Sequence, residues 1–219
     1  KGEVKLLYIA PEKLENEFFK RKLRLLNISQ IAIDEAHCVS MWGHDFRKSY
    51  GLIAEFIDNL RIRPVVTAFT ATATEVVRKD VINLLKLRNP YIYIGSFDRE
   101  NLEIKLYIEE DKLELVKDII REREGEAGII YCATRKEVDG LYYYLKDLGY
   151  DVLKYHGGLK DSEKEFYQDE FLNENSNVMI ATNAFGMGID KSNIRYIIHF
   201  TIPKNIEGYY QEIGRAGRD

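Results

Sequence analysis

The segment that most constrains this sequence is IAIDEAHCVSMWGHDFR, at positions 31–47. Its isoleucine-rich start predicts a strand buried on both faces, as in a parallel sheet. Such sheets bind their ligands at the carboxyl ends of the strands. The adjacent acids Asp34 and Glu35 are therefore predicted to lie where a ligand binds, followed by a loop of aromatic, imidazole and guanidinium groups.

Short apolar runs alternate with amphipathic ones along the chain, which predicts an α/β fold with parallel sheets covered by helices. The polar stretch GSFDREN at 95–101 interrupts this alternation and predicts two domains, 1–98 and 99–219. The predicted strands are 5–10, 30–34, 64–69, 91–94, 102–108, 128–132, 152–155, 178–181 and 194–199, and the predicted helices are 11–26, 50–60, 74–87 (with Thr74 as N-cap), 112–123, 136–148, 162–172 and 206–213.

Charge and cysteine content narrow the class of protein. The net charge of −4 argues against a tight non-specific DNA coat, so any nucleic-acid contact must come from local basic patches. Two cysteines are too few for a zinc site and suit free thiols in a reducing compartment, and the four histidines show no ligand spacing. No apolar run of about 20 residues and no signal peptide occurs, so we expect an intracellular protein without a membrane partner.

The paired acids and the loop after them suggest two kinds of chemistry. Neighbours on a strand point to opposite sides, so Asp34 and Glu35 are expected to divide the work of phosphoryl transfer. One acid would bind Mg²⁺ directly or through water, and the other would orient the attacking water. The alternative is an exposed acidic pair at a turn. In the loop, Trp42 and Phe46 offer stacking faces for single-stranded DNA, unless they pack into the core.

The DEAH tetrad at 34–37 resembles motif II of superfamily 2 helicases, and CVSMWGHDFRKSY at 38–50 is similar to the aromatic-rich loop of RecQ-family DNA helicases. The resemblance implies two RecA-like lobes and an ATP-dependent, 3′-to-5′ helicase that uses ATP and Mg²⁺. It implies single-stranded DNA and duplex or fork DNA as partners. Asp34 would bind Mg²⁺, Glu35 would act in hydrolysis, and His37 would relay between the acids and the TAT turn at 70–72. DNA contacts are expected at Trp42, His44, Phe46 and Arg47.

Further segments resemble helicase motifs in the family's order. LYIAPE at 7–12 is similar to motif Ib, and FTATA at 69–73 to motif III, whose Thr70 and Thr72 would couple the nucleotide site to DNA. A simple threonine N-cap is the alternative for that turn. IIYCATR at 129–135 resembles motif IV, YHGGL at 155–159 a turn of YHAGL type, and ATNAFGMGID at 181–190 motif V. There, Thr182 would face the nucleic-acid backbone, and Gly188 and Asp190 would bind the nucleotide.

The last ten residues, YQEIGRAGRD, resemble motif VI. Residues three apart on a helix share a face, so Arg215 and Arg218 are predicted to present two guanidinium groups to phosphate oxygens. The resemblance makes them arginine fingers that bind the nucleotide, with Gln211 supporting the same site. The alternative is a pair of surface arginines near the negative end of a helix dipole.

The sequence also departs from the family pattern. It contains no GxxxxGK[ST] phosphate loop and no upstream glutamine motif. We therefore expect a fragment with an N-terminally truncated first lobe, inactive alone, from a helicase of the bacterial cytoplasm and nucleoid or of the eukaryotic nucleus. The alternative is a non-catalytic DNA-binding or scaffold module derived from a helicase fold.

Overall fold

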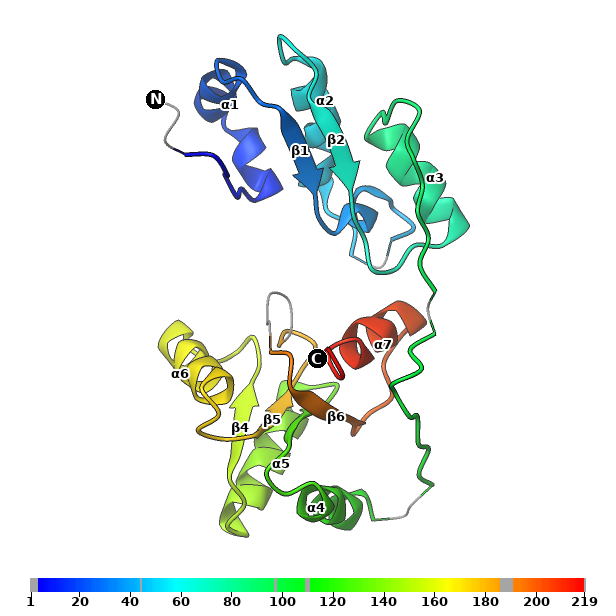
Figure 1. Ribbon diagram of the computed structural model, residues 1–219. Helices are drawn as coiled ribbons and strands as arrows, with labels where there is room; N and C mark the ends of the chain where they lie inside the picture. The colour runs from blue at the N-terminus through cyan, green and yellow to red at the C-terminus, as the bar shows by residue number, and fades with distance from the viewer. Residues whose placement is uncertain (1–3, 44, 97, 109–110, 186–190, 219) are drawn as a thin grey trace. The chain divides into compact units, whose positions relative to one another are not determined.

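The computed structural model describes residues 4–43, 45–96, 98–108, 111–185 and 191–218. The chain forms two compact units, Lys1–Gly95 and Ser96–Asp219 (Figure 1). This division lies three residues before the boundary predicted from the sequence. Each unit is described by itself.

The first unit is built around two parallel strands, with Gln30 opposite Val65 and Ile33 opposite Ala68. Its elements are η1 (Pro11–Glu15), α1 (Glu17–Arg24), β1 (Gln30–Ile33), η2 (Ala36–Val39), η3 (Lys48–Tyr50), α2 (Gly51–Asp58), β2 (Val65–Ala68) and α3 (Glu75–Leu84). The single helix predicted at 11–26 is wrong, because Asn16 ends η1 and its side chain caps α1. Thr74 caps α3 as predicted.

The second unit contains a four-stranded parallel sheet in the order β4-β5-β3-β6. Its elements are α4 (Lys112–Glu122), β3 (Ala127–Tyr131), α5 (Arg135–Asp147), β4 (Val152–Tyr155), α6 (Asp161–Leu172), β5 (Val178–Ala181), β6 (Ile194–His199) and α7 (Ile206–Ile213). Successive side chains of β3 enter different cores. Ile130 packs in one with residues of α4 and α5, and Ile129 packs in the other with Phe171 of α6. Helices therefore cover both faces of the sheet, which confirms the predicted fold class.

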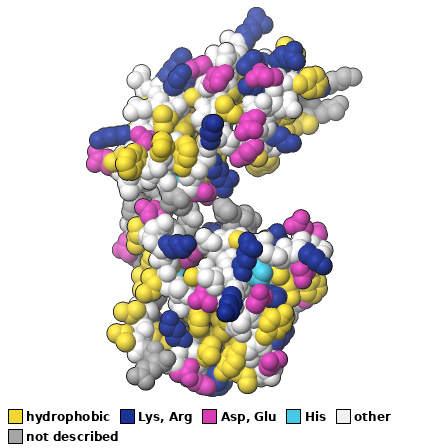
Figure 2. Space-filling model, turned by 180° about the vertical axis from the view of Figure 1, so that it is seen from behind, with side chains coloured by type: hydrophobic (Ala, Val, Ile, Leu, Met, Phe, Trp, Pro, Cys, Tyr) yellow, Lys and Arg dark blue, Asp and Glu magenta, His cyan; other side chains and the backbone are white. Residues whose placement is uncertain are grey.

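Three predicted strands, at 5–10, 91–94 and 102–108, are irregular in the described structure. Except for the half-buried Leu102, their apolar side chains are exposed, with Tyr91 at 91% and Ile108 at 91%, and hydrophobic side chains are visible on the surface of both units (Figure 2). An apolar run becomes a strand only where a neighbouring strand accepts its hydrogen bonds. Neither sheet includes these segments, so the local pattern alone predicted them wrongly.

Candidate functional site

The two acids follow β1 directly and have different surroundings. Asp34 is exposed, and its Oδ1 accepts a hydrogen bond from the Glu35 amide at 2.9 Å. Glu35 adopts a left-handed backbone conformation, with φ of 48°, that turns the chain into η2. Its carboxylate Oε2 lies 3.4 Å from Nδ1 of His37. The exposed Asp34 carboxylate fits a Mg²⁺ ion, which binds proteins through one or two carboxylates and keeps other positions for water and phosphate.

His37 is buried and joins the acids to the turn after β2. Its Nδ1 lies 2.9 Å from Oγ1 of Thr70, and the Thr70 hydroxyl donates its one proton to the carbonyl of Thr72 at 2.9 Å. Since a hydroxyl has a single proton, Nδ1 of His37 must be the donor to Thr70. The predicted contact between His37 and the 70–72 turn is therefore present.

Backbone hydrogen bonds hold the same two segments together. The Phe69 amide donates to the Ile33 carbonyl at 2.8 Å, and the Ala36 amide donates to the Phe69 carbonyl at 2.8 Å. Thr72 is also buried, but its Oγ1 has no hydrogen-bond partner within the described part of the chain. Thr70 and Thr72, which look equivalent in the sequence, thus have different environments.

The aromatic loop leaves η2 and returns to it. The Arg47 amide donates to the Cys38 carbonyl at 2.9 Å and closes the base of the loop. Trp42 is 78% exposed and Phe46 is 48% exposed, so the alternative in which they pack into the core is wrong. Arg47 donates to Asp45 at 3.0 Å, and the predicted DNA contact His44 lies outside the described residues.

Four residues that the sequence did not single out form side-chain hydrogen bonds at the two ends of this loop. The Ser40 hydroxyl donates to Asp80 of α3 at 2.6 Å, and the Ser49 hydroxyl donates to Glu12 at 2.9 Å. A hydrogen bond from its own backbone, and then the one from Ser49, lower the pKa of Glu12. Partners separated by about 40 positions leave no local signal, so the sequence could not have paired them.

In the second unit, residues of the segments that resemble motifs IV and V lie just after strands. Thr134 caps α5 in a reciprocal arrangement with Glu137. Thr182 comes directly after β5 and is buried, and its amide donates to the Tyr155 carbonyl at 3.2 Å. Gly188 and Asp190, the predicted nucleotide contacts of the motif V segment, lie outside the described residues.

The motif VI arginines are not on a helix, which corrects the sequence prediction. Helix α7 carries the half-buried Gln211 but ends at Ile213, before Arg215 and Arg218. Gly217 then turns the chain with φ of 59°, so helical spacing does not align the two guanidinium groups. Arg218 Nε donates to the Gly214 carbonyl at 2.9 Å.

Arg215 lies close enough to Tyr131, at the end of β3, for its charge to affect the pKa of the tyrosine. Burial raises the pKa of Tyr131 to about 12, and the positive charge of Arg215 partly opposes this rise. Farther along, a Cβ at Gly217 would collide with the amide of Asn101, and Arg99 donates to the Gly217 carbonyl at 2.7 Å. The turn that holds the arginines is thus fastened to the start of the same unit.

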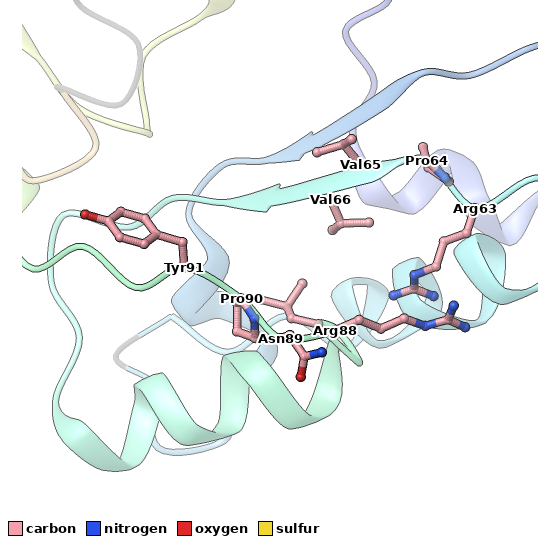
Figure 3. Close-up of a pocket in the computed structure, with 9 residues that line it drawn as sticks. Arg63, Pro64, Val65, Val66, Arg88, Asn89, Pro90 and Tyr91 are labelled. Carbon is pink, nitrogen blue, oxygen red and sulfur yellow. The ribbon is translucent and has the colours of Figure 1, made fainter.

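A hollow of about 410 Å³ lies beside β2 in the first unit, away from the acids. Figure 3 shows Val65 and Val66 on the strand, Arg63 and Arg88 toward one end and Tyr91 toward the other. None of its nine lining residues is a predicted site residue. Across the described ranges, no group of three or more His, Cys, Asp or Glu side chains could hold a metal ion, and no helix could cross a membrane.

Two family models match the chain. The DEAD/DEAH box helicase family matches residues 1–80, and the helicase conserved C-terminal domain matches residues 111–219. S. cerevisiae Dbp5 bound to RNA and ADP BeF3 is similar in structure, with a TM-score of 0.72 and 22% identity over 90% of this chain and 53% of that one. This likeness supports the RecA-like helicase fold of both units.

Relatives are similar over the whole chain. The ATP-dependent DNA helicase RecQ of Bacillus subtilis is 47% identical over 100% of this chain and 37% of its own length. The RecQ-like DNA helicase BLM of Xenopus laevis is 42% identical over 99% of this chain and 16% of its own length. The chain thus spans well under half of these relatives. Its motifs, fold and full-length similarity agree, and the chain belongs to the RecQ family of DEAD/DEAH-box helicases.

Proposed function

We propose that this chain is part of an ATP-dependent DNA helicase motor that unwinds DNA in the 3′-to-5′ direction. The observation that carries the proposal is the connection among three segments of the first unit. His37 forms a hydrogen bond with Thr70, and the base of the aromatic loop is closed by a backbone hydrogen bond to Cys38, the residue after His37. A change at the acids can therefore reach an exposed aromatic surface through a few short contacts.

The proposed partners are single-stranded DNA and duplex or fork DNA. Trp42 and Phe46 are exposed aromatic rings on one short loop, and Arg47 lies at its end. Aromatic rings stack on bases of any sequence, and a cation beside them attracts the phosphate backbone. Thr70, Thr72 and Thr182 are proposed to couple to or contact the same strand, and the protein would act in the bacterial nucleoid and cytoplasm or in the eukaryotic nucleus.

The proposed cofactors are ATP and Mg²⁺. Bound Mg²⁺ would neutralise charge on the phosphates, with Asp34 holding it directly or through water. Glu35 would orient water, and Arg215 and Arg218 would bind phosphate oxygens through planar guanidinium groups, with Gln211 supporting them. Gly188 and Asp190 are proposed to bind the nucleotide by family resemblance.

DNA binding is tested by titrating the chain with a fluorescein-labelled oligo-dT of about 20 nucleotides, which exceeds the usual site size. We expect weak binding that falls with salt. Replacing Trp42 with alanine should weaken it by about 5- to 150-fold, because stacking one base contributes about 1–3 kcal/mol. Met41→Ala is the matched control, since Met41 is equally exposed on the same loop. Equal affinities of Trp42→Ala and wild type would rule out the stacking surface.

ATP hydrolysis separates the motor from the scaffold alternative. The chain alone has no phosphate loop and should not turn over ATP, so hydrolysis that disappears in Glu35→Gln would contradict this expectation. In a longer product of the same gene that contains GxxxxGK[ST], we expect DNA-stimulated hydrolysis that Glu35→Gln abolishes. Absence of that hydrolysis would favour a non-catalytic DNA-binding module.

A further inference from the structure

Ser40 is a junction of hydrogen bonds at the base of the aromatic loop, and it is fully buried. Its amide donates to the His37 carbonyl at 3.0 Å, and its carbonyl accepts from the Gly43 amide at 3.0 Å. Its hydroxyl donates to Asp80 at 2.6 Å and accepts from the Trp42 amide at 3.1 Å. One side chain therefore connects the backbone of the exposed tryptophan to helix α3.

The direction of these bonds makes Asp80 the organising partner. A serine hydroxyl has one proton, and donating it to a carboxylate fixes the hydroxyl rotamer and leaves its lone pairs for the Trp42 amide. A hydrogen bond to an ionised acceptor is also short and strong. Without Asp80, the hydroxyl could rotate and the orientation of the Trp42 backbone would no longer be fixed.

Helix α3 begins directly after the motif III turn. Asp80 lies on this helix, so a movement of the turn would move Asp80 with it. Thr74 caps α3, and Thr70 and Thr72 precede it by a few residues. On the other side, Gly43 packs so closely on the His37 carbonyl that a Cβ there would collide with it. The loop is therefore held between the DEAH turn and α3.

We propose that Ser40 and Asp80 are a positioning pair that sets the orientation of Trp42 and ties it to α3, so that movement of the motif III turn is transmitted to the DNA-contacting loop. This deepens the proposed function and rests on it for the identity of the ligand. Neither residue touches DNA in this proposal; both act through the Trp42 backbone.

Trp42 is the one tryptophan of the chain and reports on the loop directly. Time-resolved fluorescence anisotropy of the full chain, without DNA, measures its local nanosecond motion. Ser40→Ala and Asp80→Ala should increase the amplitude of the fast component. Asp80→Asn should restore most of the wild-type decay, because an amide oxygen can still accept from Ser40. Glu75→Ala is the control, since Glu75 is an exposed acid on the same helix.

Affinity for the labelled oligo-dT is measured on the same variants. Ser40→Ala and Asp80→Ala should weaken binding by about 2- to 10-fold, the range expected when one side chain must be ordered on binding. Unchanged anisotropy and affinity in folded Asp80→Ala, whatever its melting temperature, would refute the positioning role. The anisotropy is measured without DNA. It therefore tests whether Ser40 and Asp80 position Trp42 even if Trp42→Ala shows that the loop does not bind DNA. If Ser40→Ala fails to fold, the comparison of Asp80→Ala with Asp80→Asn decides.

Discussion

The two threonines of the motif III turn should respond oppositely to the same substitution. Thr70→Val removes the hydroxyl that accepts from buried His37 and donates to the Thr72 carbonyl. Loss of these bonds, with a buried donor left behind, should lower the free energy of unfolding by about 1–3 kcal/mol. We expect a loss near the lower end of this range, because the Glu35 carboxylate lies 3.4 Å from Nδ1 of His37 and can accept a weak hydrogen bond from it.

Thr72→Val should behave differently, because its buried Oγ1 has no partner among the described residues. Replacing a hydroxyl that is already unsatisfied with a methyl group removes a desolvation penalty. We expect a change between zero and a gain of about 1 kcal/mol. The sequence alone would assign both threonines the same cost.

The measurement is urea unfolding followed by far-ultraviolet circular dichroism, because Trp42 is 78% exposed in the folded chain and its fluorescence would change little on unfolding. Thr70→Ser retains the hydroxyl and should stay within about 0.5 kcal/mol of wild type. Equal losses for Thr70→Val and Thr72→Val, with an unchanged slope against urea, would refute the assigned hydrogen bonds.

Three further predictions concern both units. Gly217→Ala should lower stability by at least about 1 kcal/mol, measured by thermal melting, because φ is 59° and the new Cβ has no room. Burial raises the pKa of Cys38 to about 11 and that of Cys132 to about 12 from 9.0, so iodoacetamide should alkylate the folded chain more slowly than the unfolded chain, by about 100-fold or more, at equal pH below about 9. In the folded chain the rate should keep rising with pH up to these values instead of levelling off near 9. Burial is the largest single influence on Asp139 and raises its pKa, but the hydrogen bonds and positive charges of Lys154 and His156 together outweigh it and lower the pKa from 3.8. Wild type should therefore be more stable than Asp139→Asn near about pH 6, and urea unfolding should show the difference disappearing as the pH falls through the lowered pKa of the folded state.

The sequence was most informative where function and local chemistry coincide. The contact between His37 and Thr70 could be predicted because each belongs to a short motif at the end of a strand, and parallel strands bring such ends together. The prediction that the first of these strands is buried on both faces is wrong, because only Ile33 of β1 is buried and Ala32 is exposed. The exposed aromatic loop could be predicted because its rings stand among polar residues. The boundaries of β4, β5 and β6 also match the predicted ranges.

The remaining errors concern properties that a local pattern does not contain. Segments 5–10, 91–94 and 102–108 have strand-like composition but no partner strand in the described structure. The helical spacing of Arg215 and Arg218 was misleading because α7 ends at Ile213 and Gly217 has a positive φ, and spacing reveals neither. The bond between Ser40 and Asp80 joins residues 40 positions apart, so only the folded chain identifies it.

The left-handed backbone at Glu35 has a consequence for how this sequence was selected. A glutamate with φ of 48° is disfavoured relative to glycine, whose lack of a Cβ makes this conformation accessible. Evolution or computational design guided by folding stability alone would place glycine at position 35. Under the proposed function, in which Glu35 orients water, the carboxylate is a place where the sequence gives up stability for activity. Glycine in an engineered variant would therefore yield a more robust protein without its second acid.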